Sequence, residues 1–136
     1  MISTTLLTFC KTSTTGDSYL DWPKFPPPVV AGQTIVTFDE TSDTVSMPLW
    51  YWKDITKYAM DMETTITLLV DIYDIHLEWT KFPNPKQDNR TLVRYDAQTD
   101  SVIMSLTFWK NIVKYVMDAE RNIDVANILI REKLKE

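Results

Sequence analysis

The sequence predicts an α+β fold made of two copies of one unit, a β-hairpin followed by a long amphipathic helix, related by a pseudo-twofold axis. The stretch LDWPKFPPP, which starts at Leu20, returns at Leu77 as LEWTKFPNP. Laid over residues 77–133 without a gap, residues 20–76 are identical at 22 of 57 positions. In each copy the apolar residues first alternate and then recur every three or four positions. These observations indicate a tandem duplication of a ββα unit.

The predicted boundaries follow from the repeat. Residues 1–19 are expected to be a signal-like segment and flexible tether, residues 20–76 the first repeat, and residues 77–136 the second. A unit of about 60 residues buries too little apolar surface to be stable alone. The two repeats are therefore expected to pack as one domain.

The first part of each repeat is expected to be extended, because prolines fix φ and remove backbone donors. A hairpin should follow, since apolar residues alternate on both sides of the polar turns DETSD and DAQTD. The inward-facing residues are expected to be Val36, Phe38, Val45 and Met47, and in the second copy Val93, Tyr95, Val102 and Met104. The pattern leaves open whether the four strands form one sheet or two hairpins.

A long helix is expected to close each repeat. Its predicted buried stripe comprises Trp52, Ile55, Ala59, Met62, Ile66, Leu69 and Tyr73, and in the second copy Trp109, Ile112, Val116, Ala119, Ile123, Ala126 and Ile130. A second line of apolar residues, Tyr51, Tyr58 and Ile72, matched by Phe108, Tyr115 and Leu129, should widen it. Ser105 is the expected N-cap of the second helix. The first helix is expected to end near His76, ahead of Pro83.

The composition argues against several classes of function. The formal net charge is −5 and the basic residues are scattered, which disfavours nucleic-acid binding. Neither of the two glycines belongs to a phosphate-binding loop, so no nucleotide cofactor is expected. One Cys and one His cannot build a zinc set, and the sequence predicts neither a metal site nor an enzyme.

Recurring polar residues have two interpretations each. The aspartates of the turns, Asp39, Asp43, Asp96 and Asp100, either form weak calcium sites or cap their own turns, and the second interpretation is favoured. The pairs Asp61/Glu63 and Asp118/Glu120 point to different sides of a helix, which favours a solvated face over an acid–base pair. His76 is expected to complement the dipole at the end of the first helix.

Three tryptophans are the candidate contacts with a partner or ligand: Trp50, Trp22 and Trp79. Trp50 is the strongest of them, because the second repeat has Thr107 at the equivalent position. Exposed aromatic rings stack on sugars and peptides. The other interpretation of all three is that they belong to the core or cover its edge.

The first ten residues, MISTTLLTFC, are apolar and end at the single cysteine, and the polar stretch KTSTTGDS follows them. This arrangement resembles the end of a bacterial lipoprotein signal peptide, in which the Cys is lipidated. The resemblance implies lipidation at Cys10 and a lipid anchor in the bacterial envelope, on the periplasmic side of the outer membrane. The alternative is a tail with an incidental Cys and a cytoplasmic protein.

The helices ITKYAMDMETTI and IVKYVMDAERNI, behind this start and a Pro-rich stretch, are similar to small lysis-cassette lipoproteins of phages and prophages, the outer-membrane spanin subunits. The resemblance implies a non-catalytic, membrane-tethered interaction protein that pairs with an envelope protein, or with itself, through helices. The alternative hypothesis is an aromatic-lined module that binds a peptide or glycan.

Overall fold

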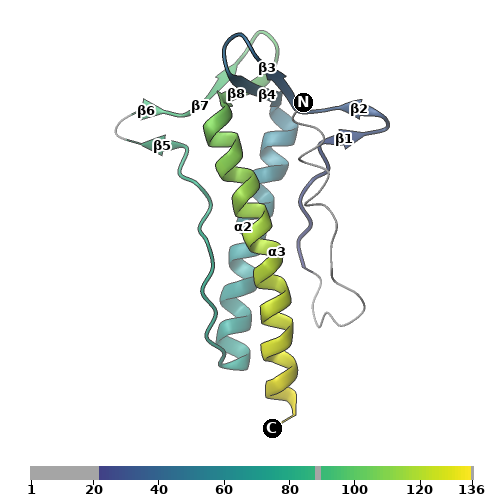
Figure 1. The fold of residues 1–136 in the computed structure, drawn as a ribbon, viewed down its shortest axis with the longest axis vertical. Coiled ribbons are helices and arrows are strands. Elements are labelled where there is room, and N and C mark those ends of the chain that lie inside the picture. Colours follow the sequence, from purple (N-terminus) through teal and green to yellow (C-terminus); the bar gives the residue numbers. More distant parts are fainter. Residues whose placement is uncertain (1–21, 88–89, 136) are drawn as a thin grey trace.

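Two long helices stand side by side on a small antiparallel sheet, in an α+β arrangement (Figure 1). The computed structural model describes residues 22–87 and 90–135. The four-stranded sheet has the order β3 (Thr37–Asp39), β4 (Thr44–Pro48), β8 (Ser101–Ser105) and β7 (Val93–Asp96). Helix α2 (Leu49–Tyr73) follows β4 directly, and α3 (Leu106–Leu134) follows β8. Because both helices begin at the sheet and run away from it, they are parallel.

The centre of the sheet is the antiparallel pair β4–β8. Its register runs from Thr44 opposite Ser105 to Pro48 opposite Ser101, with Ser46 opposite Ile103 in the middle. Ser46 and Ile103 are 57 positions apart, which is the offset of the sequence repeat. The strands that the sequence left unassigned thus form one sheet, and equivalent residues of the two halves meet at its centre.

The start of each helix is held by the hairpin of the other half. The Leu49 N–H donates to the Asp100 carbonyl at 3.0 Å, and the Leu106 N–H donates to the Asp43 carbonyl at 3.1 Å. Both aspartates have positive φ, 56° at Asp43 and 53° at Asp100. Asp tolerates this left-handed conformation better than most residues. The first N–H groups of a helix lack partners within the helix, so these bonds satisfy donors that would otherwise be unpaired.

The helix N-termini differ in their caps. The Ser105 hydroxyl accepts a hydrogen bond from the Phe108 N–H at 3.1 Å, as predicted. Pro48 stands at the equivalent position before α2 and makes no side-chain cap. At its start α2 therefore relies on the Asp100 carbonyl, whereas α3 has both the Asp43 carbonyl and the Ser105 hydroxyl.

The core lies between the two helices and under the sheet, and both halves contribute to it. The predicted stripe of α3 is buried along its whole length, and on α2 Trp52 and Tyr73 are only half-buried. Ile66 and Ile123, at equivalent positions, are both buried. Ile72 was predicted to widen the stripe, but 67% of it is exposed because the helix pair turns this position to solvent.

Helix α2 ends at Tyr73, three residues before the predicted end at His76. Asp74 adopts the left-handed conformation with φ 51°, and the Ile75 N–H donates to the Val70 carbonyl at 3.3 Å. Ile75 also packs in one apolar cluster with Val70, which completes a Schellman-type stop. His76 thus lies beyond the helix, with an exposed side chain 3.7 Å from Glu78, and the prediction that it complements the helix dipole was wrong.

Beyond Asp74 the chain reverses and runs back toward the sheet along the helices (Figure 1). We call residues 75–85 the second extended segment, and residues 22–28 the first extended segment. Phe25 meets Tyr58 edge-on at 5.4 Å, and Phe82 meets Tyr115 edge-on at 5.2 Å. Tyr51 also donates its hydroxyl to the Pro26 carbonyl at 2.7 Å. The aromatic residues of the proline-rich segments therefore hold each segment against the helices. Edge-to-face contacts between rings contribute to this packing.

Two short hairpins leave the body on opposite sides (Figure 1). One pairs β1 (Val29–Val30) with β2 (Gln33–Thr34), and the other pairs β5 (Lys86–Gln87) with β6 (Arg90–Thr91). The turn of the first has positive φ at Ala31 and Gly32, as a two-residue hairpin loop requires. The sequence did not predict these hairpins, because strands of two residues carry no periodicity.

The turns of the main hairpins carry the recurring aspartates. Asp39 accepts a hydrogen bond from the Thr41 N–H at 2.9 Å, and Asp96 accepts one from the Gln98 N–H at 3.0 Å. These are the turn-capping bonds that were favoured over calcium sites. Tyr95 was predicted to face the core, but it is 53% exposed and donates its hydroxyl to Asp100 at 2.7 Å. A polar partner in the turn thus holds this ring at the surface.

Candidate functional site: an aromatic groove beside helix α2

The second extended segment leaves a hollow of about 370 Å³ between itself and α2, which we call the aromatic groove. This volume lies within the range of small ligand sites. The groove is lined by Trp52, Thr56, Ala59, Met60 and Glu63 of α2, by Trp79, Thr80, Lys81, Phe82 and Pro85 of the extended segment, and by Tyr115 of α3.

Helical spacing explains the α2 wall. Thr56, Met60 and Glu63 lie three and four residues apart and thus on one side of the helix. Met60 is 68% exposed, whereas Ala59 is buried. The small Ala59 side chain leaves room at the base of the hollow, and the long Met60 side chain forms its rim.

Aromatic rings from α2, α3 and the second extended segment also line the groove. Phe82 lies between Trp52, at a centroid distance of 6.2 Å, and Tyr115, at 5.2 Å. Trp79 is half-buried and lines the same hollow. The chain reversal at Asp74 brings Trp79 and Phe82 back beside Trp52, although 27 residues separate the two tryptophans.

Two charged groups line the groove. Within residues 22–87 and 90–135, neither Glu63 nor Lys81 takes part in an ion pair or side-chain hydrogen bond. Tyr115 is buried, and burial, together with the Glu63 charge, raises the pKa of its phenol to about 12. The hydroxyl of Tyr115 therefore stays protonated at neutral pH and can donate a hydrogen bond.

The main chain of the second extended segment is also available. From His76 to Asn84, its N–H and C=O groups make no hydrogen bond to the other residues that the structure describes. Pro83 and Pro85 have no N–H to offer. The other groups can pair with an extended ligand, as free strand edges do.

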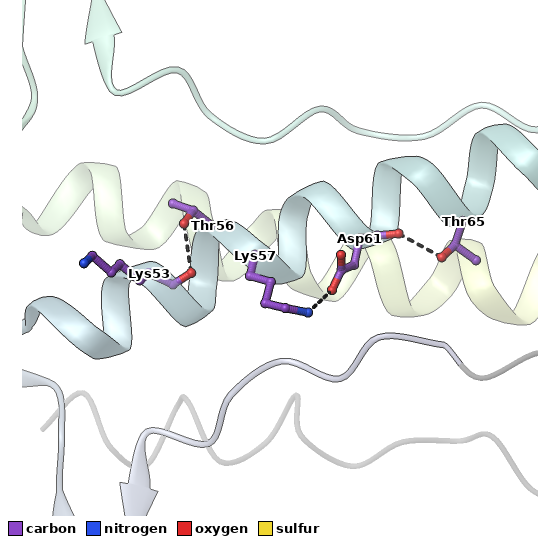
Figure 2. Close-up of polar contacts among 5 residues, drawn as sticks. All are labelled: Lys53, Thr56, Lys57, Asp61 and Thr65. Atoms are coloured by element: carbon purple, nitrogen blue, oxygen red, sulfur yellow. Dashed lines mark hydrogen bonds and ion pairs between the residues drawn. The ribbon is translucent and has the colours of Figure 1, made fainter.

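The paired charges on α2 lie outside the groove. Figure 2 shows that Lys57 and Asp61, one turn apart, point toward each other. The Lys57 Nζ atom lies 2.7 Å from Asp61 Oδ2. Thr56 and Thr65 donate their hydroxyls to the carbonyls of Lys53 and Asp61, respectively. Lys114 and Asp118 repeat the ion pair on α3 at 2.8 Å, and this bond to Lys114 is the main cause that lowers the pKa of Asp118. Asp61 fits the predicted solvated face. Asp118 does not, because its side chain is only 15% exposed and also accepts a hydrogen bond from the Thr80 hydroxyl at 2.9 Å.

Glu120 departs from that prediction. It is half-buried, and burial together with the nearby Asp124 charge raises its pKa to about 7. Glu63, at the equivalent position on α2, is exposed. The two halves therefore place the same residue type in different environments.

The three predicted tryptophans do not meet in one place. Trp50 is 51% exposed at the start of α2, with its ring edge-on to Tyr51 at 5.8 Å. Trp22 packs on the core, and its indole N–H donates to Asn127 at 3.4 Å. Among the three, Trp79 lines the aromatic groove. Sequence reasoning missed Trp52, Phe82, Tyr115 and Glu63 as groove residues, although Phe82 belongs to the repeated proline-rich motif.

Cys10, the candidate lipidation site, lies outside the described residues. Within the described ranges, no group of three or more His, Cys, Asp or Glu residues is arranged to hold a metal ion. Neither helix of these ranges has a long enough apolar stretch to cross a bilayer.

A larger hollow, of about 450 Å³, lies near the start of α3 and is lined by Pro83, Asn84, Lys86, Leu92, Ser105, Thr107, Phe108 and Asn111. It has one aromatic residue, Phe108, so it offers less stacking surface than the aromatic groove. We therefore take the aromatic groove as the candidate site. Comparison of the chain with protein-family models, with curated proteins and with solved structures finds no match.

Proposed function

We propose that the protein is a non-catalytic interaction protein that binds an extended peptide segment of a partner in the aromatic groove. The observation that carries this proposal is the groove itself, where four aromatic rings lie beside a main chain with free hydrogen-bonding groups. An extended peptide can pair with such a main chain while its side chains occupy the hollow. A glycan offers the rings a similar stacking surface but no strand to pair.

The test is selection from a displayed library of random dodecapeptides on the full chain. Met60→Trp should fill the groove from its exposed rim and abolish enrichment. Met117→Trp, at the equivalent position on α3, is the matched control and should leave enrichment intact. Enrichment that survives Met60→Trp would contradict the proposal, and binding on an oligosaccharide array in place of peptides would favour a glycan ligand.

The two-unit architecture is proposed to descend from tandem duplication of one ββα unit, with a pseudo-twofold axis through the Ser46–Ile103 pair. Support comes from the reciprocal bonds of Leu49 and Leu106 and from the matching turns at Asp43 and Asp100. Superposition of residues 22–73 on residues 79–130 tests it. Different paths of the two extended segments would count against a common origin.

A second candidate function is association through the helices. At the end of the helix pair away from the sheet, Leu68, Ile72, Val125 and Ile128 expose apolar surface. Leu68 and Ile72 lie one turn apart on α2, and Val125 and Ile128 lie one turn apart on α3, so each helix has a short exposed apolar strip. Such strips are typical of an interface. Sedimentation equilibrium of the wild type against Leu68→Lys tests it, since a dimer that the variant disrupts supports self-association and a monomeric wild type counts against it.

The proposed location is the bacterial envelope, through a lipid on Cys10. A role in phage lysis stays part of this proposal and rests on the resemblance to spanin subunits.

A further inference from the structure

The charge and the rings of the aromatic groove point to one kind of side chain. We propose that the groove selects an arginine side chain of the bound peptide, held between the aromatic rings and the Glu63 carboxylate. This inference rests on the peptide-binding function proposed above and narrows its ligand.

The first step in the argument is the carboxylate. Glu63 lines the groove and has no cationic partner among the described residues, whereas Asp61 and Asp118 each hold a lysine one turn away. An unpaired carboxylate beside a hollow attracts a cation from a ligand. Glu63 and Tyr115 line the same hollow, so the carboxylate lies on the side of α2 that faces the rings.

The second step is the set of rings. Trp52, Trp79 and Phe82 present π-systems whose faces attract cations, and tryptophan does so most strongly. Among basic side chains, the planar guanidinium stacks on such rings and also matches a carboxylate with two parallel hydrogen bonds. An ammonium group is also attracted to ring faces, but it neither stacks flat on them nor forms two parallel hydrogen bonds, so arginine fits this groove better than lysine.

Lys81 opposes this preference. Its exposed ammonium lines the same groove and repels a second cation. Its long flexible stem lets the charge turn to solvent, which weakens this repulsion without removing it. Removing its charge should therefore strengthen binding of arginine.

The experiment uses ¹⁵N NMR of the full chain and two probes, N-acetylarginine amide and its citrulline counterpart. Citrulline keeps the shape of arginine without the charge. The indole N–H signals of Trp52 and Trp79 report binding, and Trp50 is the internal control. The arginine probe should bind about tenfold more tightly than the citrulline probe.

Three variants define the site. Glu63→Gln should bring the affinities of the two probes close together, and Lys81→Met should increase the affinity for the arginine probe. Glu120→Gln, at the equivalent position on α3, should change neither. Equal affinities of both probes in the wild type, or no shift at either indole, would overturn the arginine preference. If peptide enrichment is still abolished by Met60→Trp, the peptide-binding function remains supported even when the arginine preference is wrong. The two proposals can therefore fail separately.

Discussion

Glu63 and Glu120 hold equivalent positions on the two helices and differ in what surrounds them. Glu63 is exposed at the rim of the aromatic groove, and Glu120 is half-buried near Asp124 and Tyr58. A carboxylate that loses water and faces another negative charge keeps its proton to higher pH. One residue type has therefore become a candidate ligand contact in one half and a pH-dependent group in the other.

Glu120→Gln should stabilise the protein at high pH. The pKa of Glu120 rises from 4.5 in the unfolded chain to about 7 in the fold, so the folded state binds the proton more tightly. Its contribution to stability is complete below pH 4.5 and is lost as the pH rises through 7. In urea denaturation at pH 8, the free energy of unfolding of the variant should exceed that of the wild type by on the order of 1 kcal/mol, after allowance for partial exposure. At pH 4 the two should differ little.

The control for that measurement is Glu63→Gln, which alters an exposed carboxylate at the equivalent position. It serves as the reference against which the pH-dependent gain of Glu120→Gln is compared. A Glu120→Gln gain that is the same at pH 4 and pH 8 would mean that packing, and not ionisation, is responsible.

A second asymmetry at the residue scale concerns Trp52 and Trp109. Trp109 is 1% exposed, and its indole N–H has no acceptor among the described residues, whereas Trp52 is half-buried and lines the groove. The sequence shows both as one repeated tryptophan and predicts core for both. Exposure at Trp52 depends on the path of a distant segment, which local periodicity cannot reveal.

The helix starts show how one element depends on the next. Ser105 caps α3 with its hydroxyl, while Pro48 gives α2 no such bond. Both helices also receive a carbonyl from the hairpin turn of the opposite half. The Ser105 cap of α3 is thus added to the backbone hydrogen bond that both helices make with the opposite turn.

Ser105→Ala should lower the free energy of unfolding by about 1 kcal/mol, because the Phe108 N–H loses its acceptor at a helix N-terminus. Urea denaturation monitored by circular dichroism measures the loss. Thr107→Ala, two residues further on and exposed, is the control and should change stability far less. A Ser105→Ala variant as stable as the wild type would show that the Phe108 N–H does not need the Ser105 hydroxyl as its acceptor.

At the scale of elements, the sequence predicted the strands and helices that have a periodic pattern of apolar residues. The main hairpins and both helices were expected, and the α3 stripe is buried throughout. The end of α2 was missed because Asp74, and not a glycine, adopts the left-handed stop. The aromatic groove could not be predicted either, since it exists only where the second extended segment passes α2, and no spacing in the chain specifies that path.

For the whole molecule, the decisive feature is one core that both halves build. Ile66 and Ile123 occupy equivalent buried positions on parallel helices, within the same apolar cluster. If the halves are one folding unit, loss of either side chain should destabilise all elements together.

Ile66→Ala and Ile123→Ala should each lower the free energy of unfolding by about 2–4 kcal/mol, because each leaves a cavity in a packed core. Unfolding should stay a single transition when followed by tryptophan fluorescence and by circular dichroism. Met60→Ala, at an exposed site, is the control with little expected effect. Separate transitions for the two probes would show that the halves unfold independently.

The anchor proposal is also testable on the whole chain. In a bacterial host fed labelled palmitate, the wild type should incorporate label and fractionate with membranes. Cys10→Ala should do neither, because the lipid has lost its attachment site. Label retained by Cys10→Ala, or none in the wild type, would remove the basis for an envelope location.

The reciprocal bonds between helix starts and hairpin turns have a consequence for a severed chain. Each half carries the turn that the other half's helix needs, so neither fragment of a chain cleaved between Asp74 and Leu77 contains its own complete helix start. Separately purified fragments should be largely unstructured, and mixing them at equal concentration should restore helical circular dichroism with second-order kinetics. If the fragments complement each other in this way, each folds only on association with the other, and the pair could serve as a split reporter of proximity.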